Sequence, residues 1–246
     1  MNDPTEMAKN FVGQFYAAFD TNRASIVSLY QAGSSLSFEG DNTAGQAIAQ
    51  KLSSLQLPPG SKHAITTTDA QPSCAGSGAV LVFVTGEFVG QKFQEVFQLV
   101  PQANGYYVHN QIFRVGKTNP FNAPPTSGGD VAKAFLQHYY TMFDTNRDGL
   151  VPLYRPQSLL TFEGQVKRGV QEIMAKLKEL PKVAHDGNSF TVDSQAVNGQ
   201  ALILVFVTGQ LTIDGQNPLK FTQTIILVQE GQGYYVGNDI FRLNYG

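Results

Sequence analysis

The sequence predicts an α+β fold that is present twice in one chain of 246 residues. Each half begins with aromatic residues at helical spacing and continues with segments whose apolar residues alternate, as they do in strands. Long stretches of the first half recur in the second, which is the pattern of an internal duplication. The predicted order in each half is two helices, a short strand, a third helix and four strands, with the helices packed on one face of an antiparallel sheet.

The duplication is visible in three pairs of segments. The first pair keeps an offset of 124 residues without a gap, and both members contain FDTNR and end in FEG. The pairs are Phe11–Gly40 with Phe135–Gly164, Leu81–Gly86 with Leu204–Gly209, and Tyr106–Val115 with Tyr234–Leu243. We expect repeat 1 at residues 1–115 and repeat 2 at residues 131–246. Residues 116–130 are expected to form a linker, because prolines and glycines without apolar periodicity fill this segment.

The first helix of each repeat is predicted from apolar residues at i, i+4, i+7 and i+8, which share one helix face. These residues are Phe11, Phe15, Ala18 and Phe19 in repeat 1, and Phe135, Tyr139, Met142 and Phe143 in repeat 2. A short second helix is expected at Ile26–Tyr30 and at Leu150–Tyr154. The third helix is expected at about Thr43–Leu55 and Lys167–Leu180, closing near a proline in each repeat.

The strands are predicted where the apolar period changes to two. A short strand is expected between the second and third helices, at Leu36–Glu39 and Leu160–Glu163. The four later strands are expected at about Ala64–Gln71, Val80–Phe88, Phe93–Val100 and Tyr106–Val115 in repeat 1, and at about Ser189–Val197, Ala201–Ile213, Phe221–Gln229 and Tyr234–Leu243 in repeat 2.

The strands of repeat 2 are too apolar for one sheet face to lie in water. Seven residues show this and are expected to include members of both faces: Leu202, Leu204, Phe206, Thr222, Thr224, Ile226 and Val228. An apolar outer face requires a partner, and the duplication supplies one. We therefore expect the two sheets to pack face to face as an intramolecular pseudo-dimer, so that the chain is monomeric.

Composition and motifs exclude several classes of protein. The net charge of −2 gives no basic excess for nucleic acid. The lone Cys74 excludes an internal disulfide, and neither a membrane span nor a signal-peptide core is present, so we expect a soluble intracellular protein. The four histidines lack metal-ligand spacing, and no nucleotide or nucleophile motif occurs. We expect no cofactor, metal, nucleic acid or membrane.

The segment DTNRDG, Asp144–Gly149, resembles the front of an EF-hand calcium loop. Two observations argue against calcium. The twelfth loop position needs a bidentate glutamate and holds Arg155 instead. The corresponding segment of repeat 1, DTNRAS at Asp20–Ser25, lacks the matches to Asp148 and Gly149. We therefore expect a corner between two helices, capped by its Asp, Thr and Asn side chains.

The chain resembles nuclear transport factor 2, twice and over nearly its whole length. The segments that carry the resemblance are FDTNR, LTFEG, KLSSL, ITTTDAQP and the C-terminal YYVGNDIFRLNYG. The resemblance implies two cone-shaped domains, each with three helices on a curved antiparallel sheet. It also implies a carrier without catalysis, which binds the GDP form of the small GTPase Ran and phenylalanine-glycine nucleoporins. Such a carrier is found in cytoplasm and nucleus and is enriched at the nuclear envelope and pore.

The family's Ran site is an apolar hollow rimmed by acids, which an aromatic side chain of Ran enters. In repeat 2 the matching residues are Phe162, Ile240 and Phe241 for the hollow, and Glu163 and Asp214 for the rim. The family commonly has another acid after the position of Asp214, and this chain does not.

Repeat 1 matches the same site with Phe38, Glu39, Ile112 and Phe113. Its loop from Gly86 to Phe93 is five residues shorter than that from Gly209 to Phe221, and no acid matches Asp214. His63 matches a family histidine beside the hollow, where repeat 2 is expected to have Asn188. These differences favour repeat 2 as the better Ran site.

Several residues have a plainer interpretation. Phe38 and Phe162 are equally compatible with ordinary core packing, and Glu39 and Glu163 with solvated turn charges. Arg114 and Arg242 are expected in structural ion pairs. Asp69 and Asp193 would be bases in an isomerase, but structural groups at a strand end are favoured. The chain has no tryptophan for nucleoporins, and Met7 is a loose substitute.

Two other functions remain open. One is a scaffold that binds peptide motifs, as in mRNA-export or RNA-granule proteins. The other is a small-molecule isomerase or dehydratase on the same fold. An enzyme would need a titratable group deep in the pocket with a pKa moved by burial, whereas the expected hollow is apolar with acids only at its rim.

Overall fold

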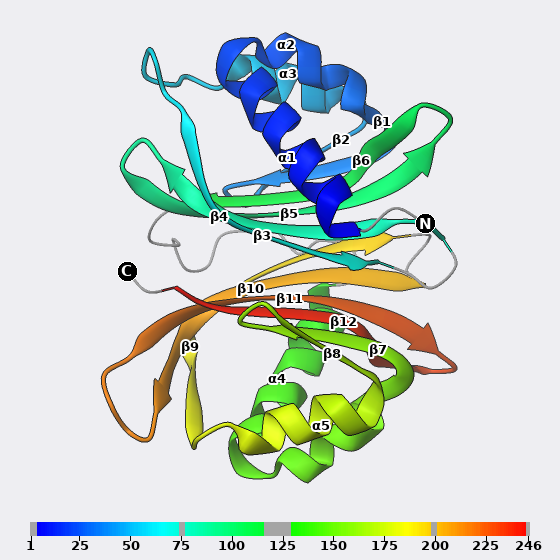
Figure 1. Ribbon diagram of the computed structural model, residues 1–246, viewed down its shortest axis with the longest axis vertical. Coiled ribbons are helices and arrows are strands. Elements are labelled where there is room, and N and C mark those ends of the chain that lie inside the picture. Colours follow the sequence, from blue (N-terminus) through cyan, green and yellow to red (C-terminus); the bar gives the residue numbers. More distant parts are fainter. Residues whose placement is uncertain (1–3, 74–76, 116–128, 198–200, 245–246) are drawn as a thin grey trace. The chain divides into compact units, whose positions relative to one another are not determined.

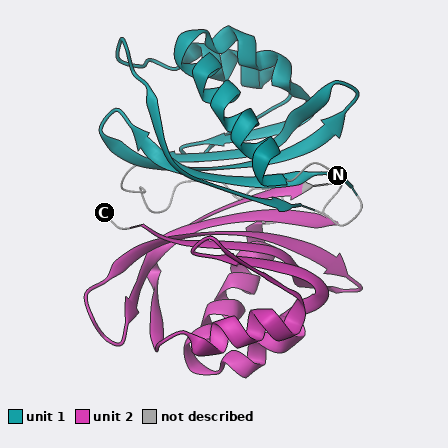
Figure 2. Cartoon of the chain, viewed as in Figure 1, with its two compact units in different colours: residues 1–117 teal, residues 118–246 magenta. Residues whose placement is uncertain are grey.

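The computed structural model describes residues 4–73, 77–115, 129–197 and 201–244. The chain divides into two compact units, residues 1–117 and 118–246 (Figure 2). Most of the expected linker, residues 116–128, and Cys74 lie outside the described residues.

Unit 1 contains the helices α1 (Pro4–Thr21), α2 (Arg23–Ile26) and α3 (Ala47–Ser54), and the 3-10 helix η1 (Val27–Leu29). Its strands are β1 (Tyr30–Phe38), β2 (Asp41–Ala44), β3 (His63–Pro72), β4 (Val80–Phe88), β5 (Gln91–Gln102) and β6 (Gly105–Val115). They form one sheet in the order β2-β1-β6-β5-β4-β3, and the helices cover one of its faces (Figure 1).

Unit 2 repeats this arrangement with α4 (Gly129–Thr145), the 3-10 helix η2 (Arg147–Leu153) and α5 (Gly169–Glu179). Its strands are β7 (Tyr154–Phe162), β8 (Gln165–Arg168), β9 (Val183–Val197), β10 (Leu202–Ile213), β11 (Leu219–Glu230) and β12 (Gly233–Asn244). The order β8-β7-β12-β11-β10-β9 is the same as in unit 1. The predicted α+β class, with helices on one sheet face in each repeat, is confirmed.

Three details differ from the prediction. The short strands β2 and β8 were missed, because each is the second half of a tight hairpin and overlaps the start of the expected third helix. The pairs β1–β6 and β7–β12 are parallel, so each sheet is mixed. The expected second helices begin earlier, at Arg23 and Arg147, and end before Tyr30 and Tyr154, which start strands; that of unit 2 is a 3-10 helix that contains Pro152.

The helix faces predicted from spacing form the two cores. In unit 1, Phe15 and Phe19 are buried, and Phe11 and Ala18 pack against the same cluster. The corresponding residues of α4 behave alike in unit 2. Burial of such aromatic side chains contributes about 2 to 3 kcal/mol each. The inner sheet face supplies the opposite wall, including Val82 and Phe97 in unit 1.

The seven apolar and threonine residues of β10 and β11 all lie on one sheet face. The register pairs Leu202 with Val228, Leu204 with Ile226, and Phe206 with Thr224, and directly paired residues share a face. The core cluster takes the alternate residues, such as Ile203 and Ile225. The expectation that the seven include both faces is wrong. The outer face is therefore more continuously apolar than the sequence suggested.

The FDTNR corner joins each first helix to a strand. Asp20 accepts hydrogen bonds from the backbone nitrogen of His63 at 2.9 Å and from its Nδ1 at 2.6 Å. Asp144 binds His185 in the same way, at 2.8 and 2.6 Å. Asn22 occupies the N-cap position of α2 without a side-chain cap bond. The aspartates thus connect helix to sheet, and local capping of this corner by Asp and Asn was a wrong prediction.

The same contacts account for the calcium-like residues of DTNRDG. Asp144 binds a histidine, whereas Asp148 pairs with Lys178. The two carboxylates therefore serve different partners. Within the described ranges, no group of three or more His, Cys, Asp or Glu residues is placed to hold a metal ion.

Candidate partner-binding site

The FEG segments form tight hairpin turns at the end of β1 and β7. Phe38 pairs with Asp41 and Phe162 with Gln165, which leaves a two-residue loop of Glu and Gly. Both loop residues have positive φ, 53° and 84° in unit 1 and 49° and 79° in unit 2. Type I′ turns require positive φ at both positions. For a glutamate this left-handed backbone conformation costs on the order of 1 kcal/mol. Both copies therefore keep a strained residue at this turn.

Each turn glutamate is bonded to the parallel neighbouring strand. The Glu163 backbone nitrogen donates to the Phe241 carbonyl at 3.1 Å, and its Oε1 accepts from the Leu243 nitrogen at 2.5 Å. Glu39 makes the same bonds to Phe113 and Val115, at 3.0 and 2.5 Å. These bonds offset the strain and fix the carboxylates at the sheet end. Glu39 is exposed and Glu163 is half-buried.

The turn glycines make room for an arginine. A Cβ on Gly40 would lie 2.9 Å from Nη1 of Arg114, and one on Gly164 would lie 3.0 Å from Nη2 of Arg242. Both arginines therefore lie against their FEG turns. This explains why the turn pairs glutamate with glycine in both repeats.

A row of stacked phenylalanines runs inward from each turn. In unit 2, Phe162 stacks on Phe241 with ring centroids 4.7 Å apart, and Phe241 stacks on Phe221 at 5.6 Å. Unit 1 has the same row, with Phe38 on Phe113 at 4.7 Å. The outermost ring of each row is only partly buried. The rings of Phe38 and Phe162 therefore pack against the core on one side and remain partly exposed on the other.

A lysine distinguishes the two rows. The Nζ atom of Lys176 lies 5.4 Å from the centroid of the Phe162 ring, within the range of a cation–π interaction. The counterpart in unit 1, Lys51, is paired with Asp41 instead. The outer aromatic of unit 2 is therefore covered by a flexible cation, and that of unit 1 is not.

Ile112 and Ile240 lie on the sheet face opposite to these rows. Ile240 pairs directly with Thr224 on the outer face of the sheet, while its neighbour Phe241 belongs to the core under the helices. Ile112 pairs with Val96 in the same manner. The structure therefore does not bring these two isoleucines together with the phenylalanine rows, because successive strand residues alternate in direction.

The histidine of repeat 2 that corresponds to His63 is His185, and the match to Asn188 is wrong. His63 and His185 bind Asp20 and Asp144 through the same atoms. Asn188 belongs to extra residues that bulge from β9 between two register positions. The connection before the histidine is three residues shorter in unit 2, so that a match at the offset of the third helix falls three residues too late.

The same bulge brings Phe190 into the core of unit 2. Its ring lies 4.8 Å from Tyr140 and 5.9 Å from Phe221. In unit 1, Phe88 stacks on His63 at 3.9 Å. Phe88 pairs with His63 as Leu211 pairs with His185. The aromatic ring near this histidine therefore comes from β4 in unit 1 (Phe88) and from β9 in unit 2 (Phe190).

Asp214 occupies a left-handed turn position at the end of β10, with φ 50°. Its nitrogen donates to the Lys182 carbonyl at 2.8 Å, and its Oδ1 accepts from the Lys182 nitrogen at 3.2 Å. In unit 1 the shorter hairpin has Val89 in the equivalent turn, with φ 51° and an exposed fraction of 48%. An anchored acid in unit 2 thus corresponds to an exposed apolar residue in unit 1.

Glu163, Asp214 and the Phe162 row lie at one end of the same sheet. Glu163 follows the end of β7, which runs parallel to β12, and Asp214 follows the end of β10. The strands β12 and β11 lie between them. The register places Phe162 level with Val207 of β10, so that Asp214 follows seven residues further along that strand. The arrangement is two acids flanking a partly exposed aromatic row, with Lys176 beside it.

Fully buried carboxyl groups under the helices were missed by the sequence analysis. Glu95 lies on the inner face of β5, where its Oε1 accepts from Gln111 and its Oε2 from the Tyr16 hydroxyl. The Tyr30 hydroxyl donates to Gln111 in turn. Burial raises the pKa of Glu95 to about 8, against the opposing effect of these hydrogen bonds.

Unit 2 contains the same network with carboxyl and amide exchanged between the strands. Asp239 on β12 accepts from Gln223 at 2.7 Å, and from Tyr139 and Tyr154 at 3.1 and 3.3 Å. The Tyr140 hydroxyl donates to Gln223 at 2.8 Å. Burial raises the pKa of Asp239 to about 6. Spacing alone could not reveal these groups, because they interrupt apolar strands at single positions.

Asp69 and Asp193 lie on the outer faces of their sheets. Asp69 pairs with Phe83 and Asp193 with Phe206, and neither phenylalanine belongs to a core cluster under the helices. The two aspartates are therefore separated from the buried Tyr and Gln groups by the sheet itself. No helix in the described parts of the chain is long and apolar enough to cross a membrane.

These features define a class: a tandem pair of cone-like α+β domains with an acid-flanked aromatic row at one sheet end of unit 2. The nuclear transport factor 2 (NTF2) domain matches residues 7–115 and again residues 131–243. The chain therefore belongs to the nuclear transport factor 2 family and contains its domain twice.

Curated relatives each cover about half of the chain. Nuclear transport factor 2 of Oryza sativa subsp. japonica is 52% identical over 119 residues, which is 47% of this chain and 96% of that protein. The protein of the same name from Saccharomyces cerevisiae is 47% identical over 118 residues, 47% of this chain and 93% of its own. Among solved structures, nuclear transport factor 2 from Cryptosporidium parvum is 41% identical, covers 47% of this chain and 93% of its own, and has a TM-score of 0.44.

Proposed function

We propose that this protein is a nuclear import carrier that binds Ran-GDP and phenylalanine-glycine nucleoporins. The observation that supports this function most directly is family membership in both halves, together with relatives named nuclear transport factor 2 at 47% to 52% identity. A carrier of this kind moves between cytoplasm and nucleus and concentrates at the nuclear envelope and pore.

The proposed Ran site lies at the sheet end of unit 2. Its centre is Phe162, where an aromatic side chain of Ran would displace Lys176 from the ring face. Glu163 and Asp214 would meet basic residues of Ran, which is the arrangement of a hot spot with charged flanks. Both acids are fixed by backbone hydrogen bonds, so little side-chain entropy is lost on binding.

Unit 1 is proposed as the weaker site, with Phe38, Glu39, His63 and Phe113. It has the corresponding aromatic row and turn glutamate but lacks a second flanking acid, since Val89 occupies the turn of Asp214. His63 is buried against Asp20, and its pKa is lowered by burial. A role for this histidine in contacting Ran would therefore be indirect.

A non-catalytic role is favoured by the environment of the buried acids. Glu95 is 1% exposed and Asp239 is 0% exposed, and every carboxylate oxygen of the two accepts a hydrogen bond from a tyrosine or glutamine. A general base must lie within reach of substrate. Enclosed in this way, the two acids are better suited to a structural network.

The test is capture of purified Ran, loaded with GDP or GTP, by the full chain and by charge-reversal variants. We expect Ran-GDP to be retained and Ran-GTP to pass through. Glu163→Lys should lower the affinity at least tenfold, and Glu39→Lys should lower it less than threefold. Because both glutamates make the same backbone bonds, Glu39→Lys is a matched control for folding. Equal losses from the two variants would refute the asymmetry, and failure to bind either Ran form would favour a peptide-binding scaffold.

A further inference from the structure

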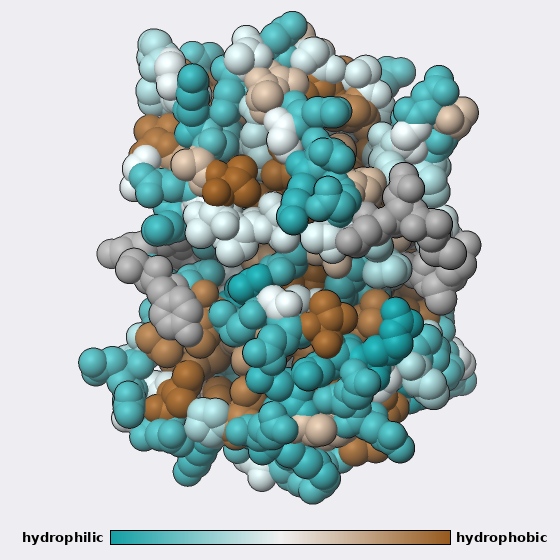
Figure 3. Space-filling view, viewed as in Figure 1, coloured by the Kyte–Doolittle hydropathy of each residue, from teal (hydrophilic) through white to brown (hydrophobic). Residues whose placement is uncertain are grey.

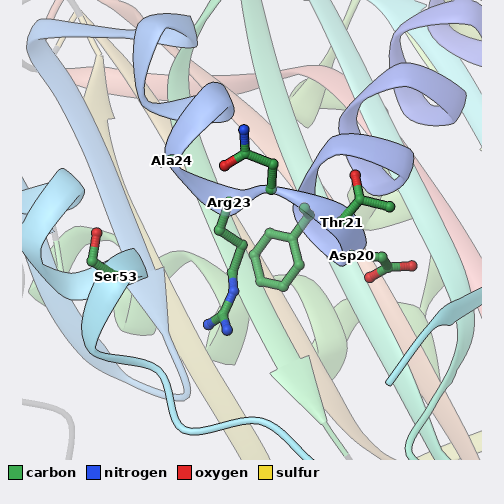
Figure 4. A pocket seen from close by; sticks show the side chains of 7 residues that line it. Asp20, Thr21, Arg23, Ala24 and Ser53 are labelled. Atoms are coloured by element: carbon green, nitrogen blue, oxygen red, sulfur yellow. The ribbon is translucent and has the colours of Figure 1, made fainter. Parts of the chain in front are cut away.

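A pocket of about 370 Å³ lies at the helix corner of unit 1 (Figure 4). It is lined by Phe19, Asp20, Thr21, Asn22, Arg23, Ala24 and Ser53. The side chain of Arg23 extends from the corner toward the segment that carries Ser53 (Figure 4). It donates from Nη1 to the carbonyls of Leu52 and Leu55, at 3.3 and 2.8 Å.

In unit 2 an ion pair spans the same place. Arg147 donates from Nη1 to Leu177 and Leu180, as Arg23 does to Leu52 and Leu55. This correspondence makes Lys178 the counterpart of Ser53, and the repeat offset makes Asp148 the counterpart of Ala24. Lys178 is paired with Asp148. Unit 1 therefore has small side chains, Ala24 and Ser53, at both positions of this ion pair.

The two arginines also differ in how many of their donors are used. Arg147 donates from Nε to the Phe143 carbonyl at 3.2 Å and from Nη2 to the Pro181 carbonyl at 2.5 Å, besides its two Nη1 bonds. For Arg23 the described part of the chain supplies acceptors to Nη1 alone. The guanidinium of unit 1 thus has two donor groups, Nε and Nη2, that no described residue satisfies.

The loop after the third helix accounts for this difference. Seven residues separate Leu55 from His63, whereas four separate Leu180 from His185. The short connection in unit 2 brings the Pro181 carbonyl to Nη2 of Arg147. In unit 1 the connection is longer and contains Pro58, Pro59 and Gly60. None of its described carbonyls accepts a hydrogen bond from Nη2 of Arg23. The open guanidinium therefore follows from the loop, not from the arginine itself.

We propose that the corner pocket of unit 1 binds the carboxylate of an acidic side chain on a partner polypeptide. A guanidinium presents Nε and Nη2 as a fork that matches the two oxygens of one carboxylate. The amide of Asn22 adds a polar group to the wall, and the Phe19 ring adds an apolar surface. The Ser53 hydroxyl, in contrast, already donates to the Ala49 carbonyl at 2.8 Å. Asp20 lies on the same wall, so a singly charged carboxylate fits better than a doubly charged phosphate.

This pocket lies in unit 1 and is separate from the proposed Ran site of unit 2, whereas in unit 1 it is connected to the weaker site through the Asp20–His63 hydrogen bonds. The Ran site uses the FEG turn and the phenylalanine row, whereas the pocket uses the FDTNR corner and Ser53. The pocket would hold an acidic group of a partner, whereas the acids of the Ran site would meet basic groups of Ran. A chain with this pocket could therefore hold an acidic segment with unit 1 while unit 2 binds Ran.

The experiment is an NMR titration of the full chain, which follows the Nε–H signals of Arg23 and Arg147. The probe is N-acetyl-L-aspartate amide, and N-acetyl-L-asparagine amide is the uncharged control. We expect the Arg23 signal to move with a Kd of roughly 10 mM, the scale of one charge-assisted hydrogen-bonded pair, while the Arg147 signal stays in place. The asparagine probe should leave both signals unchanged.

A matched variant closes the pocket without touching Arg23. Ala24→Asp combined with Ser53→Lys rebuilds the ion pair that unit 2 already tolerates, and should weaken the aspartate probe at least tenfold. The reverse change, Asp148→Ala with Lys178→Ser, opens the corner of unit 2 but leaves the Arg147 donors bonded, so its signal should still not respond. An unmoved Arg23 signal, equal binding in the closed variant, or tighter binding of inorganic phosphate would each overturn the proposal.

Discussion

Replacing the buried Glu95 by glutamine should stabilise unit 1 near neutral pH. In the folded protein the pKa of this carboxyl is raised to about 8 from an ordinary value of 4.5, chiefly by burial. Between these two values the unfolded chain has released a proton that the folded chain retains. Stability is therefore greatest below pH 4.5 and falls as the pH rises toward 8.

The size of the effect follows from the interval between the two pKa values. At pH 7, about 2.5 units above the ordinary value, the loss is about 3 kcal/mol at about 1.36 kcal/mol per unit. Glutamine cannot ionise and has nearly the same shape. It can accept from Tyr16 as Gln223 accepts from Tyr140 in unit 2, and Gln111 can turn its amide to accept the new donor. The variant should therefore gain up to about 3 kcal/mol at pH 7 and nothing at pH 4.

The assay is urea unfolding at pH 4, 7 and 8, followed by the NMR methyl signals of Val82 and Leu99 in the core of unit 1. The stability difference between Glu95→Gln and the natural chain should increase through all three pH values. Asp239→Asn is the control, because the pKa of Asp239 is raised only to about 6, and its effect should be constant between pH 7 and 8. A difference for Glu95→Gln that does not change with pH would refute the reasoning.

Further predictions concern positions where the two units can be compared. Gly86→Ala should cost about 3 kcal/mol, because its Cβ would lie 2.5 Å from the Ala64 carbonyl oxygen, a backbone atom that cannot move away. Gly209→Ala should cost less in thermal denaturation and least when Phe190 is also alanine, since its closest contact, at 2.6 Å, is that ring. Asp144→Ala should lower stability by about 1 to 3 kcal/mol by leaving the buried His185 donors unpaired, while Asp148→Ala, which breaks only an exposed pair, should lower it by under about 1 kcal/mol; equal losses would refute this assignment. In size-exclusion chromatography we expect a species of 26.8 kDa, and one of twice that mass would refute the intramolecular pseudo-dimer, which remains a prediction.

Most of the fold could be predicted from the sequence, because the duplication provides two independent segments from which each helix and strand can be predicted. The strand Val80–Phe88 has the same bounds in sequence and structure, and the helical face of Phe15 and Phe19 is the core face. The prediction was wrong where a tertiary contact replaced the contact expected within the local segment. The caps expected from Asp20 and Asn22 did not form, because the Asp20 carboxylate reaches a histidine 43 positions away.

The candidate site was predictable only in part. The string FEG located the turn, but alternation along β12 separates Ile240 from Phe241, and a motif match ignores which way a side chain points. Asp214 was assigned through the family resemblance, although its equivalence to Val89 needed the backbone. Hydrophobic residues are visible on the surface (Figure 3), and the large exposed ones among the described residues include Val89 and Val166. Exposure of this kind cannot be read from composition.

The exchange of carboxyl and amide between the two cores bears on how the repeats diverged. An ancestral core with one arrangement cannot reach the other by a single substitution, because Glu95 and Gln111 correspond to Gln223 and Asp239. An intermediate with two acids would set two buried carboxyl groups in contact, with one proton to share between them. An intermediate with two amides stays neutral and can be satisfied by rotating one side chain. Divergence through the double amide is therefore the accessible route, and a recombinant that joins β5 of one repeat to β12 of the other would recreate the costly intermediate in one step.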